Sequence, residues 1–263
     1  MRIDIYLHKF GYTRSRKKAQ DLIAAGGITV DGKPVKKASL EIDETVSHEV
    51  SVSEICPYVG RGGLKLEGAL DAFHISPKGK IAVDVGASTG GFTDCLLKRG
   101  AVKVYAVDAG SDQLAEELRR DARVVSMERF NARDLSPSSL SELCDLAVMD
   151  VSFISQTYIL PGVASVLKPG GQFISLIKPQ FEAGKSAIGK NGIVHSGAYR
   201  FLAVKRVLHT AEGLGLACIG LMRSPIKGGD GNVEYLAAFE KKVGEIVSPS
   251  VTDTMIQRLT AVD

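Results

Sequence analysis

A glycine-rich turn behind an apolar run is the part of this sequence best suited to hold a ligand. The run ends in Asp84-Val85, and the turn and the residues after it read Gly86-Ala87-Ser88-Thr89-Gly90-Gly91-Phe92. An apolar strand that enters a glycine turn and then a helix presents free backbone N–H groups to a nucleotide-like ligand. The spacing Gly-x-x-x-Gly-Gly differs from the Gly-x-Gly-x-x-Gly of dinucleotide-binding enzymes. The turn therefore predicts a nucleotide-like ligand other than a dinucleotide.

Two carboxylates near this turn narrow the choice of ligand. Asp84 precedes the first glycine by two residues, where it could meet an ammonium group. Asp108 ends the next apolar run, where it could bridge ribose hydroxyls. One carboxylate is placed for an amine and one for a ribose, and the sequence has no pyrophosphate-binding loop. These features favour S-adenosylmethionine over NAD as the ligand. The cofactor-binding residues predicted from this region are Asp84, Gly86, Ala87, Ser88, Thr89, Gly90, Gly91, Phe92 and Asp108.

A second set of polar residues stands at the ends of later apolar runs. Asp150 and Lys178 each end such a run, and Glu234 opens the last one. Lys65 lies near the start of an expected helix over residues 64–73. Ligands of open α/β sheets bind at the carboxyl ends of the strands, so Asp150, Lys178 and Glu234 are expected to share one cleft, and Lys65 completes the set if its helix joins them there. We predict that Lys65, Asp150, Lys178 and Glu234 are catalytic.

This set suits methyl transfer to a ribose hydroxyl. Such a hydroxyl is a poor nucleophile and must lose its proton as the methyl group of the sulfonium arrives. A lysine can act as the base when burial and a neighbouring cation bring its pKa towards neutrality. We expect Lys178 to be the base and Lys65 the neighbouring cation. Asp150 is expected to orient the lysines and face the cofactor's sulfonium, and Glu234 to hold Lys65 or the ribose.

The alternation of apolar runs and amphipathic segments predicts the fold that positions these groups. Seven runs, separated mostly by helical segments, indicate a doubly wound α/β fold with a mostly parallel sheet. The runs are 81–85, 102–107, 123–127, 145–151, 171–178, 216–223 and 233–239. Because only a loop joins the last two, they should form a hairpin that adds one antiparallel strand. We therefore expect a Rossmann-like, seven-stranded methyltransferase domain.

The first part of the chain is strongly basic. The whole chain carries a net charge of only +3. Residues 1–37 hold nine lysines and arginines against three aspartates, a net +6, whereas residues 41–54 are acidic. A local basic field attracts polyanions such as nucleic acid. The RNA-binding residues predicted here are Arg2, Arg14, Arg16, Lys17, Lys18, Lys33 and Arg61.

Local signals predict a small α+β module in the same region. A helix should end before Gly11, and a second helix over residues 14–25 should be capped by Thr13. Asp31-Gly32 should form a tight hairpin turn between two short strands. Four basic residues crowd the start of the second helix, where cations oppose the helix dipole. Docked phosphates would explain that placement.

This module resembles the S-four RNA-binding domain over residues 1–55. The matching residues are Tyr12, Ser15-Arg16, Ala19, Ile23, Gly26, Val30-Asp31-Gly32 and Val35. The resemblance implies a platform that grips structured RNA. We expect a linker over 56–63, the methyltransferase domain over 64–245 and a C-terminal tail over 246–263, with a short surface helix after Val251.

The set Lys65, Asp150, Lys178 and Glu234 matches the Lys-Asp-Lys-Glu tetrad of FtsJ-like ribose 2′-O-methyltransferases. With the front module, the chain resembles the TlyA family of bacterial ribosomal RNA methyltransferases, which also bear the name haemolysin. The resembling segments are 61–66, 86–93, 131–133, 150–155, 178–182 and 231–235. The resemblance implies a cytidine 2′-hydroxyl of the large subunit as substrate, and in some members of the small subunit too.

The resemblance also suggests roles for two further residues. Asn131 would lie near the adenine of S-adenosylmethionine, and Asp150 would also face that cofactor. Phe153 would stack on a flipped RNA base, with plain core packing as the open alternative. FtsJ-like turns often carry proline where this chain has Thr89, which is expected to cap the following helix instead. Residues 181–200 form either a lid or a plain surface loop.

Several classes of protein fit the sequence poorly. No apolar run approaches the ~18 residues of a membrane span, and the first ten residues lack the apolar core of a secretion signal. Four scattered cysteines predict neither disulfides nor a metal site and fit a cytoplasmic location. Partners are then ribosomal RNA or ribosomal subunits. Two alternatives stay open: an RNA-binding protein with an inactive methyltransferase fold, and a pore-forming haemolysin.

Overall fold

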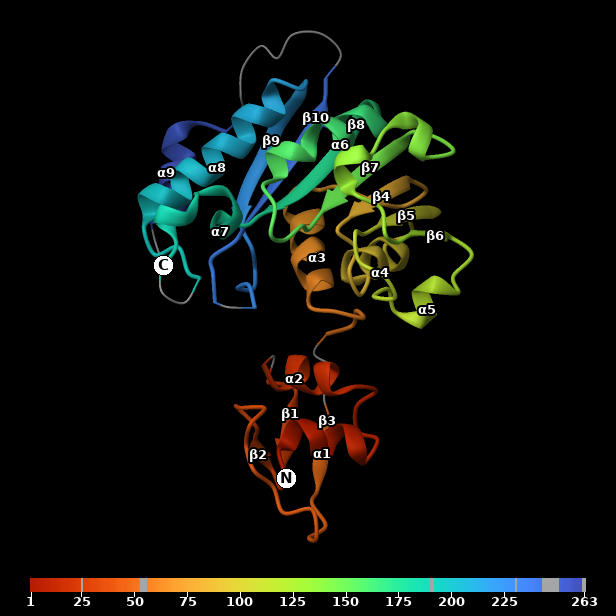
Figure 1. Ribbon diagram of the computed structural model, residues 1–263, viewed down its shortest axis with the longest axis vertical. Coiled ribbons are helices and arrows are strands. Elements are labelled where there is room, and N and C mark those ends of the chain that lie inside the picture. Colours follow the sequence, from red (N-terminus) through yellow and green to blue (C-terminus); the bar gives the residue numbers. More distant parts are fainter. Residues whose placement is uncertain (25, 53–55, 190–191, 230, 243–250, 262–263) are drawn as a thin grey trace. The chain divides into compact units, whose positions relative to one another are not determined.

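The structure is a computed structural model that describes residues 1–24, 26–52, 56–189, 192–229, 231–242 and 251–261 (Figure 1). The chain divides into two compact units, Met1–Gly63 and Leu64–Asp263. Each unit has its own hydrophobic core, and the two are described separately.

The first unit packs two helices on a small antiparallel sheet. The helices are α1 (Ile3–Lys9) and α2 (Arg16–Ala24). The strands β1 (Ile28–Val30), β2 (Lys33–Pro34) and β3 (Val50–Val52) pair in the order β2-β1-β3. Apolar residues spaced along both helices face one core, which contains Ile3, Leu7, Leu22, Ile23 and Ile28.

Two local signals in this unit have different outcomes. The hairpin turn is confirmed, because Asp31 and Gly32 both have positive φ (49° and 72°) between the paired residues Val30 and Lys33. The capping prediction for Thr13 is wrong. Ser15 is the residue whose side chain accepts from the N–H of Lys18, whereas the Thr13 hydroxyl donates to the carbonyl of Ser15. Thr13 lies too far before the helix to reach its first turn.

The second unit is built on a seven-stranded sheet with the order β6-β5-β4-β7-β8-β10-β9 (Figure 1). Only β10 runs antiparallel to its neighbours, β8 and β9, which confirms the predicted terminal hairpin. The strands are β4 (Ile81–Val85), β5 (Lys103–Val107), β6 (Val124–Met127), β7 (Cys144–Met149), β8 (Leu167–Ile177), β9 (Leu216–Arg223) and β10 (Tyr235–Lys241).

Helices of this unit connect the strands. They are α3 (Gly62–Ala72), α4 (Gly91–Lys98), α5 (Glu116–Arg119), α6 (Leu160–Val166), α7 (Pro179–Glu182), α8 (Gly197–Glu212) and α9 (Asp253–Ala261). The first two residues of α3, Gly62 and Gly63, fall within the segment 56–63 that the sequence suggests as a linker. The helix α9 contacts α8 and β9, and it buries Ile256. Residues 243–250 and 262–263, which belong to the predicted tail, lie outside the described residues.

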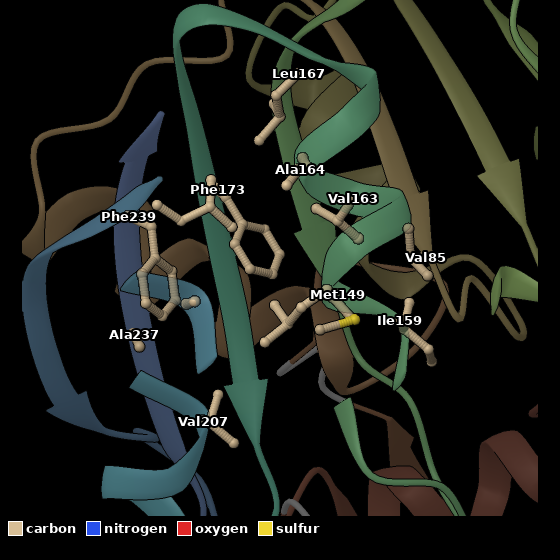
Figure 2. Packing of buried hydrophobic residues seen from close by; sticks show 14 of the residues in the cluster. Val85, Met149, Ile159, Val163, Ala164, Leu167, Phe173, Val207, Ala237 and Phe239 are labelled. Carbon is tan, nitrogen blue, oxygen red and sulfur yellow. The ribbon is translucent and has the colours of Figure 1, made fainter. Parts of the chain in front are cut away.

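The core of the second unit lies between the sheet and the helices α6 and α8 (Figure 2). Phe173 of β8 and Phe239 of β10 are register partners, and their rings stack with centroids 5.3 Å apart. Met149 of β7 and Val163 of α6 are completely buried in the same core. Central strands covered on both faces need continuous apolar runs, so polar residues are displaced to the strand ends, where the site forms.

Candidate active site

The glycine turn after β4 is held against the end of β7. Gly86 has a φ of +86°, and a Cβ there would lie 2.5 Å from the carbonyl oxygen of Asp150. Gly90 is the N-cap of α4, with a φ of +94° and no side-chain cap. The prediction that Thr89 caps this helix is therefore wrong. The backbone of Gly90 occupies the N-cap position instead, and the Thr89 carbonyl accepts from the N–H of Ala115.

Asp108 is fixed beside this turn by backbone donors. Its Oδ2 accepts from the N–H of Ser88 at 2.8 Å, and its Oδ1 accepts from the N–H of Gly110 at 2.7 Å. Ser88 itself has a φ of +49°, an uncommon backbone for a residue with a side chain. A carboxylate offers about four lone-pair sites, so Asp108 can still accept hydrogen bonds from a ribose.

Asp84 is enclosed beneath the turn, whereas the sequence suggested that it would face the ligand. It is completely buried, and its Oδ2 accepts from the hydroxyl of Thr93 at 2.7 Å. Burial raises its pKa to about 7, with a further upward contribution from the charge of Asp150. Asp84 is not among the residues that line the pocket described below, so its contact with a ligand ammonium stays a prediction that this position does not favour. Its place beneath the turn links β4 to α4.

A pocket of about 650 Å³ opens at the carboxyl ends of β4, β5 and β7. Six of the predicted residues line it: Gly86, Ser88, Asp108, Asn131, Asp150 and Phe153. Five other predicted residues of the turn do not border it and instead shape the turn or pack behind it; these are Ala87, Thr89, Gly90, Gly91 and Phe92. Lining residues that sequence reasoning missed include Gln113, Arg129, Arg133 and Ser152. Arg129 lies just beyond the end of β6, and this position was the one sequence signal that could have identified it.

Lys178 and Asp150 form the first ion pair of the site. Lys178 follows β8 directly, and its Nζ lies 2.6 Å from Oδ1 of Asp150, which follows β7. The same Nζ donates to the hydroxyl of Ser152 at 2.8 Å. The side chains of Lys178 and Asp150 are 12% and 21% exposed, so water can reach both, and Asp150 borders the pocket.

Lys65 and Glu234 form the second ion pair. The Nζ of Lys65 in α3 lies 2.6 Å from Oε2 of Glu234, and both side chains are nearly buried. A Cβ on Gly228 would lie 2.5 Å from the Glu234 carboxylate, so the loop before β10 packs closely against that carboxylate. Tyr235 pairs with Ile177, and one further antiparallel step sets Glu234 beside Lys178. The structure therefore brings the four predicted residues to one end of the sheet as two ion pairs.

Phe153 is presented to solvent by a strained backbone. Its side chain is 92% exposed, and its φ is +65°. The ring lies 5.2 Å from the ring of Phe181, measured between centroids. Core packing, the open alternative for this residue, is therefore wrong. The left-handed backbone of Phe153 costs stability, and such strain concentrates at functional sites.

The segment after Lys178 is tied to the loop that carries Glu234. Asn232 is 1% exposed; its Oδ1 accepts from the N–H of Val194, and its Nδ2 donates to the carbonyl of Gly192. Arg200 is also buried and donates to the carbonyl of Val194. Residues 190–191 of this segment lie outside the described residues. The part that the structure describes is therefore pinned at its C-terminal end.

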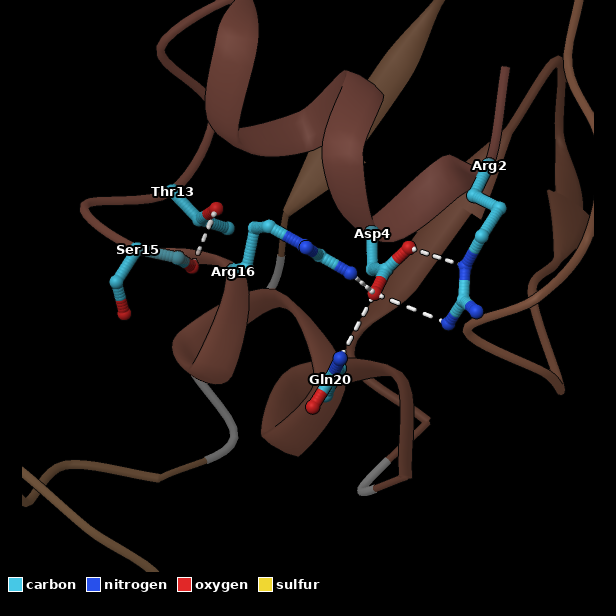
Figure 3. Close-up of polar contacts among 6 residues, drawn as sticks. All are labelled: Arg2, Asp4, Thr13, Ser15, Arg16 and Gln20. Carbon is cyan, nitrogen blue, oxygen red and sulfur yellow. Dashed lines mark hydrogen bonds and ion pairs between the residues drawn. The ribbon is translucent and has the colours of Figure 1, made fainter.

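The basic residues of the first unit divide into two groups. Arg2 and Arg16 both pair with Asp4, which also accepts from Gln20 (Figure 3). Burial pushes the pKa of Asp4 upward, but these hydrogen bonds outweigh burial and lower it to about 2. The other predicted RNA-binding residues of this unit are Arg14, Lys17, Lys18, Lys33 and Arg61. Of these, Arg14, Lys17 and Lys33 are exposed.

Comparison with known families agrees with this architecture. Residues 58–241 match the FtsJ-like methyltransferase family, and residues 1–46 match the S4 domain. The first match covers well over half of the chain. This protein belongs to the FtsJ-like methyltransferase family and carries an S4 domain in front of the methyltransferase domain.

Similar proteins cover nearly the whole chain. Hemolysin A of Brachyspira hyodysenteriae is 45% identical over 91% of this chain and 99% of its own length. The 16S/23S rRNA (cytidine-2′-O)-methyltransferase TlyA of Mycobacterium tuberculosis is 40% identical over 98% of this chain and 96% of its own. A solved Streptococcus thermophilus structure, provisionally named a hemolysin, has a TM-score of 0.79 and 42% identity, covering 99% of this chain and 94% of that one. None of the described helices is long and apolar enough to cross a membrane.

Proposed function

We propose that this protein transfers a methyl group from S-adenosylmethionine to the 2′-hydroxyl of a cytidine in ribosomal RNA. The large subunit is the expected target, and the small subunit is a second one to test. The observation that carries the proposal is the pair of lysine–carboxylate contacts beside the pocket. The TlyA relative named above supports the choice of reaction and substrate. The same substrate would place the protein in the cytoplasm.

The pocket suits the cofactor in size and in chemistry. Its volume of about 650 Å³ is within the range of small-molecule sites. Asp108 would hold the ribose of the cofactor, Asn131 would lie near the adenine, and Asp150 would face the sulfonium. At Gly86 the absence of a Cβ allows the turn to approach Asp150. When bound, S-adenosylmethionine supplies a methyl group that is activated by the positive sulfur.

The four polar residues at the sheet end would act on the ribose hydroxyl. Lys178 would accept the hydroxyl proton at Nζ after its own proton has passed to Asp150 or to water. Lys65 would disfavour a second positive charge nearby, and Glu234 would keep Lys65 in place through their 2.6 Å contact. Ser152 would orient Lys178 through its hydroxyl. Alignment of the hydroxyl should supply much of the rate, because an aligned nucleophile has already lost its translational freedom.

The RNA would be held at two places. The exposed ring of Phe153 borders the pocket and offers a stacking surface for a base that has left its helix. Basic residues of the S4 domain, such as Lys17 and Lys33, would contact phosphates. Both contacts are proposals that rest on exposure and charge.

The direct test is methylation in a purified system. The protein is mixed with undermethylated ribosomal subunits and labelled S-adenosylmethionine, and modified riboses are mapped. We expect label at a cytidine 2′-oxygen. Lys178→Ala should lower the rate by about 100-fold or more, the usual scale of a lost general base, while cofactor affinity changes only a few-fold. Methylation at the wild-type rate by this variant would exclude Lys178 as the base.

A matched control is available on the same strand. Lys168 lies near the start of β8 and pairs with Asp145 at 2.7 Å, as Lys178 pairs with Asp150 at the other end. Lys168→Ala should keep nearly full activity.

RNA binding without any label in the RNA would favour the alternative of an RNA-binding protein with an inactive methyltransferase fold. Leakage of liposomes caused equally by wild type and Lys178→Ala would favour the alternative of a pore-forming haemolysin.

A further inference from the structure

Two arginines in the wall of the pocket have guanidinium groups without a partner. Arg129 and Arg133 line the pocket and are exposed, and neither side chain forms a hydrogen bond or ion pair with any residue that the structure describes. Most other arginines of the described chain are engaged; Arg119 pairs with Glu128, for example. Unpartnered cations that share one pocket indicate an anion that the protein itself does not supply.

The backbone presents these two arginines in a defined way. Arg129 has a φ of +58°, and its N–H donates to the carbonyl of Gly110 at 2.8 Å. The N–H of Arg133 donates to Oδ1 of Asn131 in a short 3₁₀ turn. A left-handed arginine costs roughly 1–2 kcal/mol, and such strain concentrates at functional sites. The position of Arg129 is therefore determined by the fold around the pocket.

The acids around these arginines are already occupied. Glu128 holds another arginine, Asp108 accepts two backbone N–H groups and Asp150 holds the catalytic lysine. Asp134 stands in the same turn as Arg133, but the described residues include no ion pair between them. The backbone N–H groups do not neutralise Asp108, so its carboxylate offsets part of the positive charge of the two guanidinium groups, and the rest is not balanced by a described residue of the pocket.

This charge is the wrong sign for the cofactor alone. S-adenosylmethionine carries a sulfonium, an ammonium and one carboxylate, so it is a net cation and the guanidinium groups repel it. The RNA, the second substrate under the proposed function, is a polyanion. We propose that Arg129 and Arg133 bind a backbone phosphate of the RNA, and that RNA binding thereby strengthens the binding of S-adenosylmethionine. By linkage, the cofactor strengthens RNA binding by the same factor.

The experiment measures binding by the full-length protein. S-adenosylmethionine affinity is determined with and without a ribosomal RNA transcript, and RNA affinity is determined as a function of salt. The variant combines Arg129→Asn, since asparagine tolerates the left-handed backbone, with Arg133→Gln. We expect its RNA affinity to fall and its salt slope to drop by about 1.4 to 1.8, the equivalent of two phosphate contacts. Cofactor affinity without RNA should stay equal or rise, and the gain on adding RNA should shrink.

Two further variants make the result specific. Arg258→Gln removes another exposed arginine that has no described partner and does not line the pocket, and it should change nothing. Arg129→Lys with Arg133→Lys keeps both charges and should restore most of the salt slope. Restoration also shows that a loss in the first variant does not come from misfolding.

Two outcomes would overturn the inference. Weaker cofactor binding by the Asn/Gln variant without RNA would mean that the arginines hold the cofactor's own carboxylate. An unchanged salt slope would mean that they touch no phosphate. Neither measurement needs methyl transfer. Failure of wild-type protein to methylate the RNA would therefore refute the proposed function and leave the phosphate subsite intact.

Discussion

At the scale of single residues, two buried aspartates show how surroundings give one side chain opposite properties. Asp4 is held by two arginines and a glutamine, and its pKa falls to about 2 despite burial. Asp84 has one hydroxyl donor and a buried oxygen without any described partner, and burial raises its pKa to about 7. Asp4 therefore stabilises its unit as an anion, whereas Asp84 is best accommodated with its proton.

A pH-dependent difference in stability follows for Asp84. Its folded pKa of about 7 lies above the ordinary value of 3.8, so the folded state binds the extra proton between these values. Its contribution to the free energy of unfolding therefore decreases as pH rises from about 4 to about 7. Asp84→Asn mimics the protonated form and should gain about 2 to 3 kcal/mol relative to wild type between pH 5 and pH 8, measured by urea unfolding.

Asp71→Asn is the control for this measurement. A hydrogen bond from Arg99 lowers the pKa of Asp71, so this group does not titrate between pH 5 and pH 8. The difference between Asp71→Asn and wild type should therefore be constant over that range. Parallel pH curves for Asp84→Asn and wild type would contradict the assignment of Asp84.

At the scale of elements, the glycine turn and the strand ends form one unit. Asp150 donates its N–H to the carbonyl of Val85, and Gly86 lies against the carbonyl of Asp150. The turn that lines the pocket therefore contacts the residue that holds Lys178. A change in the turn should therefore affect the ion pair of Lys178 and Asp150 without any substitution in that pair.

Gly86→Ala tests this link. The added Cβ would lie 2.5 Å from backbone oxygen, on a residue with a φ of +86°. The control is Gly79→Ala, which has a φ of +73° but nothing within 4 Å of the added Cβ. The control should cost about 1 to 2 kcal/mol for its backbone alone. Gly86→Ala should lower the free energy of unfolding, measured with urea, clearly more than Gly79→Ala does, and it should also weaken cofactor binding. Equal losses for the two variants would show that the turn accommodates the added Cβ without further cost.

At the scale of the whole molecule, the chain joins an RNA-binding unit to a catalytic unit. Each has a separate core, so each can be altered without direct damage to the other core. Residues 1–37 of the first unit carry a net charge of +6, whereas the second unit carries the pocket and the two ion pairs. Substitutions of basic residues in the first unit should therefore change RNA affinity and leave cofactor binding unchanged.

Lys17→Gln with Lys33→Gln addresses the grip on RNA. Both side chains are exposed, and Lys17 makes only a 3.5 Å surface pair with Asp21. We expect weaker RNA binding with a salt slope reduced by up to about 1.8, and unchanged cofactor affinity, measured by titration with an rRNA transcript. Arg16→Gln removes the same charge but also a partner of buried Asp4, so it should lower stability as well. An unchanged salt slope for the double variant would exclude these lysines as phosphate contacts.

Patterns that act over a few residues could be predicted from the sequence alone. The seven apolar runs, the antiparallel last strand, the Asp31-Gly32 turn and the placement of Asp150, Lys178 and Glu234 at strand ends all depend on local periodicity and turn chemistry. Because parallel strands end at a common edge, that local information was also sufficient to predict that Asp150 and Lys178 would meet, and the hairpin added Glu234. The position of Lys65, on a helix, was suggested by the family resemblance.

Tertiary structure alone decided which of these residues reach the pocket and which are enclosed. Asp84 is buried under the turn, Arg2 and Arg16 are drawn to Asp4, and Phe153 stands in solvent although it follows a buried strand. Arg129 and Arg133 border the pocket although neither was among the predicted site residues. Burial and side-chain pairing depend on segments far apart in the chain, and no local pattern records which distant segment arrives beside a given residue.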